Sequence, residues 1–334
     1  MRLLAVTTTG IACAELSARS QWQVKEVLRE PTVACLAVAP GQRDTVYAAM
    51  NGGVMRSLDG GETWHQAGVS AGSIKSLAVS PHDPDTVYAG TKPAGVSVSR
   101  DGAQTWSELQ GFRRSRRWYW FSPAEPPDWR AYVSAVSVSP TDPAVIVAGV
   151  EAGAVVRSED GGASWSSHRK KADRDCHALT FHVSDGNWVY EAGGGGPAVS
   201  RDAGRSWRHP LEGLAGRYCM ACAADPERPE VWYVAASPMA VLPRFWEMPV
   251  AHASGRAHGA IYRSSGGSRW EKLNGGLPQP LDHMAYALLT LKDAPGHLYA
   301  GLKSGEVWHS SDYGDSWTVL PANLGAIRSM VVLG

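Results

Sequence analysis

An eight-residue pattern, Ser-x-Asp-x-Gly-x-x-Trp, recurs along this chain and constrains its fold more than any other feature. The clearest copies are "SLDGGETW", "SRDGAQTW", "SEDGGASW", "SRDAGRSW" and "SSDYGDSW", which end at Trp64, Trp106, Trp165, Trp207 and Trp317. A decayed copy, "RSSGGSRW", ends at Trp270, and a seventh, "ELSARSQW", ends at Trp22. Successive tryptophans are 42, 42, 59, 42, 63 and 47 residues apart. A repeat near forty residues indicates an array of equivalent structural units.

Each unit also carries strand and turn signals upstream of the pattern. Examples are "IKSLAVSPHDPDTVYAGT" and "VSAVSVSPTDPAVIVAGV", in which β-branched residues are bounded by Pro, Asp and Gly. Each unit therefore supplies four short strands, A to D, and the repeated pattern forms the turn from C to D. Four strands at this period predict one blade of a β-propeller, so the seven tryptophans predict an all-β, seven-bladed propeller.

The two ends of the chain predict how the ring closes. The chain begins with "RLLAVTT", which has the character of strand B with no strand A before it, and ends with "IRSMVVLG", a strand A with no B after it. The C-terminal strand is therefore expected to complete the N-terminal blade, which removes exposed strand edges. We expect one domain over residues 1–334.

Composition agrees with a turn-rich protein and narrows the class of partner. The chain has 36 Gly and 21 Pro, as expected for many turns. Lys plus Arg equals Asp plus Glu, 32 of each. This balance argues against a nucleic-acid or membrane-surface protein, which needs a basic excess. No stretch of the sequence is long and apolar enough to span a bilayer.

The five cysteines and the N-terminus favour a reducing, cytoplasmic location. The cysteines lie mostly in apolar, strand-like stretches and are interpreted as small buried thiols. In the C-x-x-C of Cys219 and Cys222, a spacing of three predicts thiols on opposite faces of a strand. The first residues resemble a short signal peptide, but three threonines interrupt the apolar run.

The chemistry of the repeated turn suits folding better than catalysis. Asp59 can accept hydrogen bonds from backbone N–H groups of its own turn, and Gly61 can adopt a positive φ. Trp64 then buries a large ring beside the next strand. The same structural role is expected for Asp59, Asp101, Asp160, Asp202 and Asp312. An active site is needed once, whereas this turn is repeated.

The repeated pattern resembles the Asp-box, or BNR repeat. This family of propellers includes sialidases, xyloglucanase-type glycoside hydrolases, sortilin-type receptor ectodomains and photosystem II assembly propellers of the Ycf48 type. The resemblance covers nearly the whole chain and implies a propeller with Asp-boxes at the outer bottom edge of the blades, remote from ligands. It implies no particular activity, because function depends on the site and not on the fold.

The irregular spacings predict two long loops on the top face, where the D–A and B–C connections lie. One is a D–A loop at about 110–132 and the other a B–C loop at about 237–259. Long loops on a rigid scaffold often carry binding residues. The first contains four arginines followed by Trp118, Tyr119, Trp120 and Phe121, which suit either an aromatic platform for a ligand or a plug over the axis. The second contains His252 and His258, interpreted as ordinary loop histidines in preference to ligands.

The starts of the A strands and the B–C loops are expected to surround a polar mouth on the propeller axis. The A-strand starts contribute Lys75, Arg130, Tyr132, Asp175, His177, Arg217, Tyr218, Asp282, His283 and Arg328. The B–C loops contribute Asn51, Lys92, Glu151, Glu191 and Lys303. A concave mouth with convergent polar groups predicts a ligand site, although solvated side chains line any propeller channel.

Three activities are compatible with this mouth. A sialidase would use Arg130, Arg217 and Arg328 as a carboxylate clamp, but the F/Y-R-I-P motif of sialidases is missing. Another glycoside hydrolase needs two opposed carboxylates, for which Glu151 and Glu191 are the first choice and Asp175 and Asp282 the second. A metal-assisted or acid–base enzyme would combine His177 and His283 with Glu151 or Glu191.

The favoured hypothesis is a non-catalytic propeller that binds a small molecule, glycan or peptide at the top mouth. The ligand-binding residues predicted for it are Lys75, Trp118, Trp120, Arg130, Tyr132, Asp175, Arg217, Tyr218 and Arg328. The catalytic candidates of the alternative are Glu151, Glu191, His177 and His283. The sequence requires no cofactor and leaves a metal ion possible.

Overall fold

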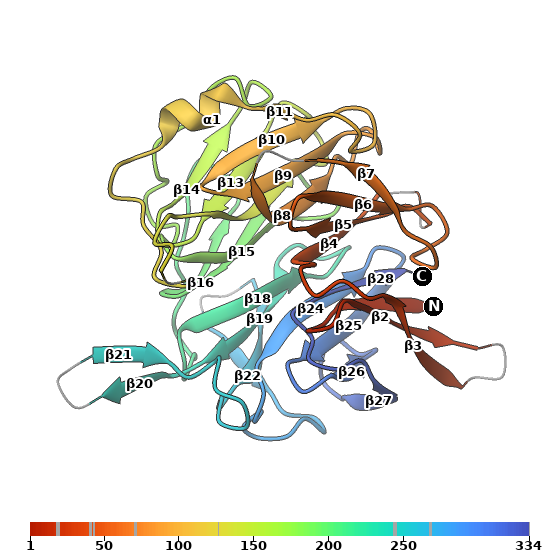
Figure 1. Ribbon diagram of the computed structural model, residues 1–334. Helices are drawn as coiled ribbons and strands as arrows, with labels where there is room; N and C mark the ends of the chain where they lie inside the picture. The colour runs from red at the N-terminus through yellow and green to blue at the C-terminus, as the bar shows by residue number, and fades with distance from the viewer. Residues whose placement is uncertain are drawn as a thin grey trace.

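Seven β-sheets surround a central axis in the computed structural model, which describes residues 1–17, 21–39, 42, 44–69, 72–125, 127–242, 246–266 and 269–333. The predicted all-β, seven-bladed propeller is therefore confirmed for the described residues (Figure 1). Blade 1 contains β28 (Ser329–Leu333), β1 (Arg2–Val6), β2 (Ile11–Leu16) and β3 (Trp22–Leu28). Because β28 pairs with β1, the C-terminal strand closes the N-terminal blade as expected.

The next three blades follow in chain order. Blade 2 contains β4 (Cys35–Val38), β5 (Val46–Met50), β6 (Gly53–Ser57) and β7 (His65–Gly68). Blade 3 contains β8 (Ser73–Val79), β9 (Val87–Lys92), β10 (Gly95–Ser99) and β11 (Ser107–Glu108). Blade 4 contains β12 (Val133–Val138), β13 (Ile146–Val150) and β14 (Ala154–Ser158), and residues 166–169 add backbone hydrogen bonds at its outer edge.

The last three blades complete the ring. Blade 5 contains β15 (Cys176–Phe181), β16 (Val189–Gly193) and β17 (Gly196–Ser200). Blade 6 contains β18 (Tyr218–Ala224), β19 (Val231–Ser237), β22 (Ala260–Ser265) and β23 (Glu271–Leu273). Blade 7 contains β24 (Ala285–Leu291), β25 (Ala294–Leu302), β26 (Glu306–Ser310) and β27 (Thr318–Asn323).

Both long segments lie at the end of the axis where the A strands begin, which we call the top mouth. Residues 110–132 connect blades 3 and 4 and contain helix α1 (Gln110–Ser115). Residues 237–259 connect the second and third strands of blade 6 and form a projecting hairpin of β20 (Met239–Leu242) and β21 (Trp246–Pro249) (Figure 1). Residues 126 and 243–245 of these segments lie outside the described residues. Within the described part of the chain, no helix has the length and hydrophobicity needed to cross a bilayer.

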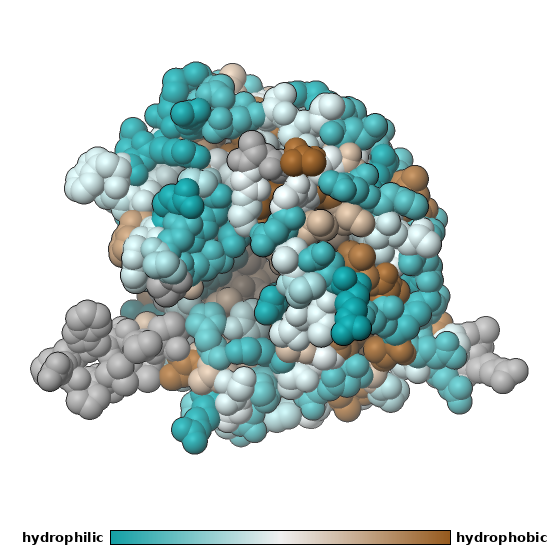
Figure 2. All heavy atoms as spheres, viewed as in Figure 1, coloured by the Kyte–Doolittle hydropathy of each residue, from teal (hydrophilic) through white to brown (hydrophobic). Residues whose placement is uncertain are grey.

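The hydrophobic core is divided into seven clusters, one between each pair of neighbouring blades in the described structure. Strand alternation explains this division, because successive side chains of a central strand point to opposite faces. In β5, for example, Val46 packs toward blade 1 and Tyr47 toward blade 3. The outer surface is largely hydrophilic on the side shown in Figure 2.

The repeated turns form the hydrogen bonds that their chemistry predicts. The Ser57 hydroxyl donates to Asp59 Oδ1 at 2.7 Å, and the Thr63 hydroxyl donates to Asp59 Oδ2 at 2.5 Å. Equivalent bonds occur at Asp101, Asp160, Asp202 and Asp312. These carboxylates therefore have structural partners. The two weaker copies, ending at Trp22 and Trp270, include residues 18–20, 267 and 268, which lie outside the described residues.

A β-bulge near the start of strand A recurs in blades 3 to 7. Each bulge adds one residue, and the added residues are Lys75, Ser134, His177, Met220 and Tyr286. A bulge changes the direction of the side chains that follow it. The prediction that Cys219 and Cys222 face opposite sides of their strand was wrong for this reason. The bulge lies between them, and both thiols are buried in the cluster between blades 5 and 6.

The stability of blade 4 is expected to depend on pH through His168. Its Nδ1 accepts a hydrogen bond from the Val155 N–H, and burial followed by the charge of Arg174 lowers its pKa from 6.5 to about 4. Between pH 6.5 and pH 4, the unfolded chain therefore binds more protons at His168 than the folded chain does. The contribution of neutral His168 to the free energy of unfolding is complete above pH 6.5 and is lost as the pH falls toward 4. Because His168 is only half-buried, we expect a loss of about 1–2 kcal/mol in the free energy of unfolding.

The measurement is urea unfolding of wild-type protein and of H168N between pH 7 and pH 4.5. An asparagine oxygen can accept the same Val155 N–H bond without titrating. The difference between the two proteins should therefore grow in favour of H168N as the pH falls. Parallel pH profiles would contradict the role of His168.

Candidate functional site

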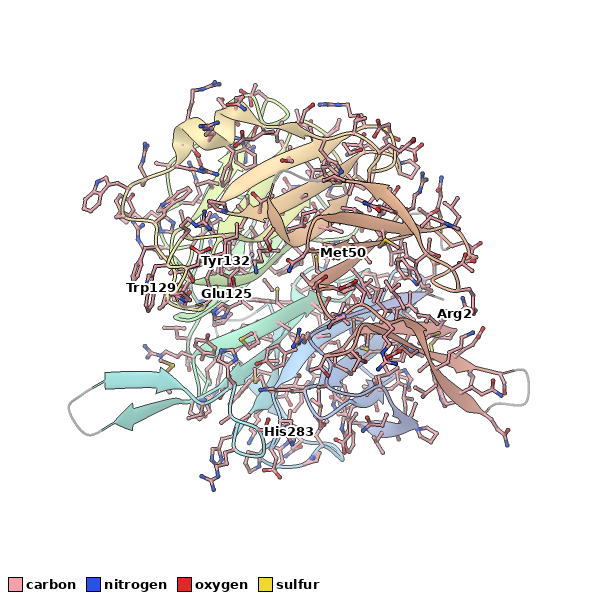
Figure 3. All side chains as sticks on the ribbon, viewed as in Figure 1. Arg2, Met50, Glu125, Trp129, Tyr132 and His283 are labelled. Atoms are coloured by element: carbon pink, nitrogen blue, oxygen red, sulfur yellow. The ribbon has the colours of Figure 1, made fainter. Side chains whose placement is uncertain are left out.

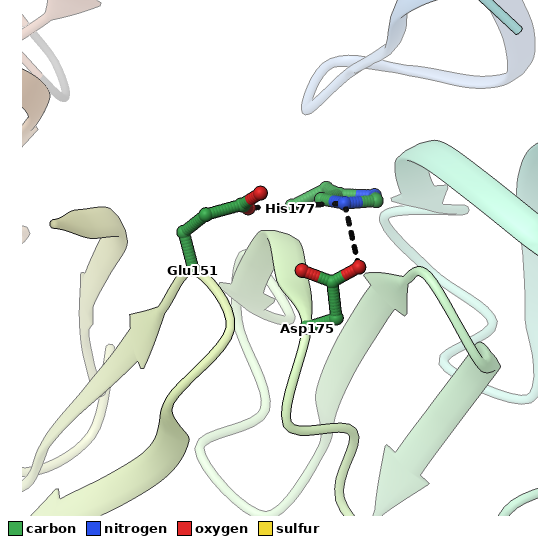
Figure 4. Close-up of side chains that lie close together, drawn as sticks. All are labelled: Glu151, Asp175 and His177. Atoms are coloured by element: carbon green, nitrogen blue, oxygen red, sulfur yellow. Dashed lines mark ion pairs between the residues drawn. The ribbon is translucent and has the colours of Figure 1, made fainter. Parts of the chain in front are cut away.

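Three ionisable side chains meet at the top mouth. Glu151 follows β13, Asp175 precedes β15, and His177 is the residue added by the β15 bulge. Their nearest ligand atoms all lie within 4.8 Å of one another. His177 Nε2 is 3.5 Å from Asp175 Oδ2 and 3.8 Å from Glu151 Oε2. These distances exceed ordinary hydrogen-bond lengths, so the contacts are ion pairs when the ring is protonated (Figure 4).

The His177 ring is fixed by a backbone contact with the neighbouring blade. Its Nδ1 lies 2.7 Å from the Cys219 carbonyl oxygen and must donate there, because a carbonyl only accepts. This bond directs Nε2 toward the two carboxylates. The His177 side chain is only 6% exposed, and its buried Nε2 has no hydrogen-bond partner. Blade 5 thus presents a rigid, unsatisfied imidazole nitrogen to the mouth.

The three groups change one another's ionisation. Burial raises the pKa of Glu151 to about 7, and the positive charge of His177 only partly opposes this effect. Burial opposes protonation of His177, but Asp175 and Glu151 outweigh it and raise its pKa to about 8. Burial also opposes ionisation of Asp175, yet its contact with His177 keeps its pKa below the usual value. Near neutral pH, the protonated His177 ring is therefore the positive partner of both Glu151 and Asp175.

Aromatic side chains from blades 6 and 7 extend this cluster. The Tyr218 ring lies 4.7 Å from the His177 ring between centroids. The Tyr218 hydroxyl is 3.1 Å from His252 Nε2, and His252 Nδ1 is 2.6 Å from the Tyr286 hydroxyl. Burial, followed by the charges of His177 and Lys303, lowers the pKa of His252. A neutral imidazole therefore links the two tyrosines, donating to one hydroxyl and accepting from the other.

The 110–132 loop is attached to the opposite side of the mouth by an acidic residue. Glu125 accepts hydrogen bonds from Lys75 at 2.8 Å and from Lys92 at 2.9 Å. Both ammonium groups also lie 5.7 Å from the centroid of the Tyr132 ring. The labelled Glu125 and Tyr132 lie close together in Figure 3. Glu125 therefore holds the base of this loop against blade 3, and Lys75 and Lys92 are paired within the protein.

A glycine-rich turn makes room for Asp175. A Cβ atom at Gly194 would lie 2.1 Å from Asp175 Oδ2, which no real structure tolerates without movement. Gly194→Ala is therefore expected to displace Asp175 or the turn and to lower the free energy of unfolding by about 1–3 kcal/mol.

Thermal or urea unfolding can test this, with Gly72→Ala as the matched control. A Cβ at Gly72 would approach no atom closer than 3.4 Å, which is an ordinary contact. The control should stay within about 0.5 kcal/mol of wild type. Equal stability of the two variants would show that Asp175 does not depend on Gly194.

The other catalytic candidates are not brought to this cluster. Glu191 is wholly buried, and its Oε2 accepts the Asp173 N–H at 2.9 Å. Burial raises the pKa of Glu191 well above its usual value, so it is a neutral core acid and not the opposed partner of Glu151. Among the described residues, no hydrogen bond or ion pair joins His283 to the cluster, and its buried Nδ1 has no hydrogen-bond partner.

The three arginines of the predicted carboxylate clamp have different surroundings in the structure. Arg130 forms two hydrogen bonds with Asp128, at 2.7 and 2.8 Å, beside the 110–132 loop. Arg217 and Arg328 are exposed, and within the described ranges neither forms an ion pair. Arg130 is therefore occupied by Asp128, and the carboxylate clamp stays a prediction.

The two tryptophans expected to form a platform have opposite environments. Trp118 is 94% exposed and contacts Tyr119 edge-on, with 5.9 Å between ring centroids. Trp120 packs against the core between blades 3 and 4, where its ring lies 6.1 Å from that of Phe112. Trp120 thus packs between two blades, which is neither the predicted platform nor the predicted plug over the axis, whereas Trp118 is free to contact a ligand or partner.

A large cavity lies at the opposite, bottom end of the axis. It measures about 990 Å³ and is lined by strand-A ends such as Val79, Val138 and Phe181. Its His182 is satisfied, because Nε2 bonds to the Asp225 carbonyl and Nδ1 accepts the Asp185 N–H. None of the predicted site residues lines this cavity. We place the site at the top mouth because unsatisfied polar groups converge there.

Sequence reasoning missed several residues of the top mouth. Tyr286 was missed because the bulge that turns it inward has no sequence signal. Glu125 was missed because its two lysine partners come from a different blade segment. The glycine run at 193–196 was the signal that could have indicated close packing around Asp175.

Comparison with solved structures agrees with the β-propeller fold of this chain. An ancestral GH74 enzyme superposes with a TM-score of 0.64 and 17% identity over 86% of this chain and 38% of its own. The GH74 xyloglucanase of Xanthomonas campestris gives a TM-score of 0.62 and 19% identity over 90% of this chain and 46% of its own. This chain thus spans less than half the length of either GH74 protein.

Two further similarities are to a peptide-bound propeller and to a short segment of a xyloglucanase. Ycf48 bound to D1 peptide gives a TM-score of 0.57 and 16% identity over 88% of this chain and 84% of its own. An oligoxyloglucan-reducing end-specific xyloglucanase of Emericella nidulans is 53% identical over 36 residues, which are 11% of this chain and 4% of that enzyme. No family model matches the chain. At these identities the structural similarities show the fold alone.

Proposed function

We propose that this protein is a ligand-binding propeller of the Asp-box type whose top mouth holds a small, hydroxyl-rich molecule, such as the end of a glycan. The observation that carries the proposal is the convergence of Glu151, Asp175 and His177, with an unsatisfied imidazole nitrogen, on the propeller axis. Ligand sites combine a few oriented polar groups with aromatic walls. Blades 4 and 5 contribute this cluster, and blades 6 and 7 contribute Tyr218 and Tyr286 beside it.

The surroundings of the cluster support a ligand with both hydroxyl groups and apolar faces. Tyr132 and Tyr218 flank the acidic pair, and Tyr286 continues the aromatic wall through His252. Tyrosine rings supply apolar contact area while their hydroxyls supply hydrogen bonds. Carboxylates accept hydrogen bonds from hydroxyl groups, and a protonated imidazole donates to them. A sugar ring presents both kinds of surface.

A glycoside hydrolase at the same mouth is the second candidate. The similarity to GH74 enzymes and the short match to a xyloglucanase favour it. The two carboxylates nearest each other would be Glu151 and Asp175, in place of the Glu151 and Glu191 pair. The His177 imidazole lies against both of them, which leaves little room for a glycosidic bond between them. We therefore favour binding over hydrolysis.

The test is ligand-observed NMR with xyloglucan oligosaccharides, and with a hydrophilic peptide as the competing ligand class. We expect saturation transfer from wild-type protein to the sugar, loss of it in Y218A, and retention in the exposed-residue control W118A. Loss in W118A with retention in Y218A would place binding on the 110–132 loop. Absence of sugar transfer, or transfer to the peptide alone, would overturn the glycan proposal.

Hydrolysis is tested separately by following reducing ends released from the same oligosaccharides. The binding proposal predicts no release above that of an E151Q control. Release by wild type that falls at least about 100-fold in E151Q would replace the binding proposal with the hydrolase.

A further inference from the structure

We propose that Glu151, Asp175 and His177 hold one divalent first-row metal ion, such as Zn²⁺ or Mn²⁺, at the top mouth. This inference rests on the proposed function and deepens it, because the ion would be the anchor for the hydroxyl groups of the ligand. Each residue offers one donor atom, and the three donors lie within 4.8 Å of one another. They come from two neighbouring blades, so the rigid propeller fixes their arrangement.

The separations between donors fit a small ion. Ligand atoms about 2.0–2.2 Å from a tetrahedral metal ion are separated from one another by roughly 3.3–3.6 Å. His177 Nε2 lies 3.5 Å from Asp175 Oδ2 and 3.8 Å from Glu151 Oε2. These two separations lie within a few tenths of an ångström of the tetrahedral range, and the donor atoms of Glu151 and Asp175 lie at most 4.8 Å apart. In Figure 4 all three side chains point toward a common space.

His177 is oriented as metal-binding histidines usually are. Its Nδ1–H donates to the Cys219 carbonyl at 2.7 Å, which leaves the lone pair on Nε2 in the neutral ring. Imidazoles that bind metals commonly use their second nitrogen in this way, which fixes both tautomer and ring direction. Only 6% of the His177 side chain is exposed, and its Nε2 has no hydrogen-bond partner. An orphaned buried nitrogen directed at two carboxylates is the independent observation for a ligand.

The charges of the site suit a cation that replaces the proton of His177. The nearby ammonium groups of Lys75 and Lys92 are paired with Glu125, so protonated His177 is the cation that faces Glu151 and Asp175, and a metal ion bound at Nε2 would displace its proton. Two carboxylates and one imidazole form a mixed oxygen and nitrogen set, which suits Zn²⁺ or Mn²⁺ better than the six to eight oxygens that Ca²⁺ takes. Three protein donors leave coordination positions for water or ligand hydroxyls.

The test uses the full chain, dialysed against chelator and titrated with Zn²⁺ by calorimetry and with Co²⁺ by visible absorption. We expect one ion per chain and Co²⁺ absorption bands of a low-coordinate site. Losing a direct ligand in E151Q or D175N should weaken binding by more than the roughly 10- to 100-fold that loss of an outer hydrogen-bond partner costs. H177Q should lose binding as well, and circular dichroism checks that each variant is folded.

E191Q and H283Q are the matched controls, because Glu191 is a buried acid within β16 and His283 is a histidine that, among the described residues, forms no ion pair with the cluster. Both should keep wild-type affinity. Absence of stoichiometric binding, or equal affinity in E151Q and E191Q, would overturn the inference and leave the three residues as a metal-free ion triad.

The metal titration contains no glycan, and the glycan titration is repeated with chelator, so that the two proposals fail separately. Glycan binding that persists unchanged in chelator would overturn the metal inference alone. One ion bound at the cluster, with no glycan binding in its presence, would overturn the proposed function alone.

Discussion

Replacing Trp207 with alanine is expected to lower the free energy of unfolding by about 3–5 kcal/mol. Trp207 is 3% exposed, lies in the cluster between blades 4 and 5, and donates through Nε1 to the Gly204 carbonyl at 3.1 Å. The substitution removes the ring, leaves a cavity between two blades and exposes that carbonyl. Equilibrium urea unfolding is the measurement.

Trp118→Ala is the matched control for this prediction. Trp118 is 94% exposed, so its removal should change the free energy of unfolding by no more than about 0.5 kcal/mol. Equal losses in the two variants would contradict the assignment of Trp207 to an inter-blade core and of Trp118 to an open surface.

Replacing His177 with glutamine is expected to cost about 2–4 kcal/mol in chelator-treated protein. The change removes the only side chain that pairs with both Glu151 and Asp175 within the described residues, and it leaves two partly buried carboxylates without a cation. Because Asp175 keeps a side-chain exposure of 37%, the expected loss lies below that of a fully buried pair.

A double-mutant cycle with E151Q separates the charge effect from a loss of packing. Removing one carboxylate from the H177Q background should restore at least half of the lost stability, because the remaining charge is the more exposed Asp175. If the double variant loses as much free energy of unfolding as the two single variants together, the three groups are not electrostatically coupled. Urea unfolding at constant pH measures all four corners of the cycle.

The fold could be predicted from the sequence because its signals are local and repeated. Each Ser-x-Asp-x-Gly-x-x-Trp turn satisfies its own hydrogen bonds within five residues, as at Asp59. Counting such turns therefore counts blades, and the strands missing at the two ends identify the closing pair β28 and β1. The long spacings likewise marked where additional residues had to be inserted.

The site could be predicted only in part, because it depends on contacts between blades. Counting from strand ends placed Glu151, Asp175, His177 and Tyr218 in one predicted ring of polar residues, but it did not predict which of them lie in contact. The same counting failed for Glu191, which strand alternation turns into the core between blades. No pattern in a single sequence marks a bulge that shifts the strand register by one residue. The same holds for Lys75 and Lys92, which are paired with Glu125 of a distant loop.

A crystal structure of the protein soaked with a xyloglucan oligosaccharide tests the proposed site most directly. We expect sugar density at the top mouth, against Tyr218 and within hydrogen-bond distance of the Glu151, Asp175 and His177 cluster. Density confined to the bottom cavity among Val79, Val138 and Phe181, with none at the top mouth, would contradict it.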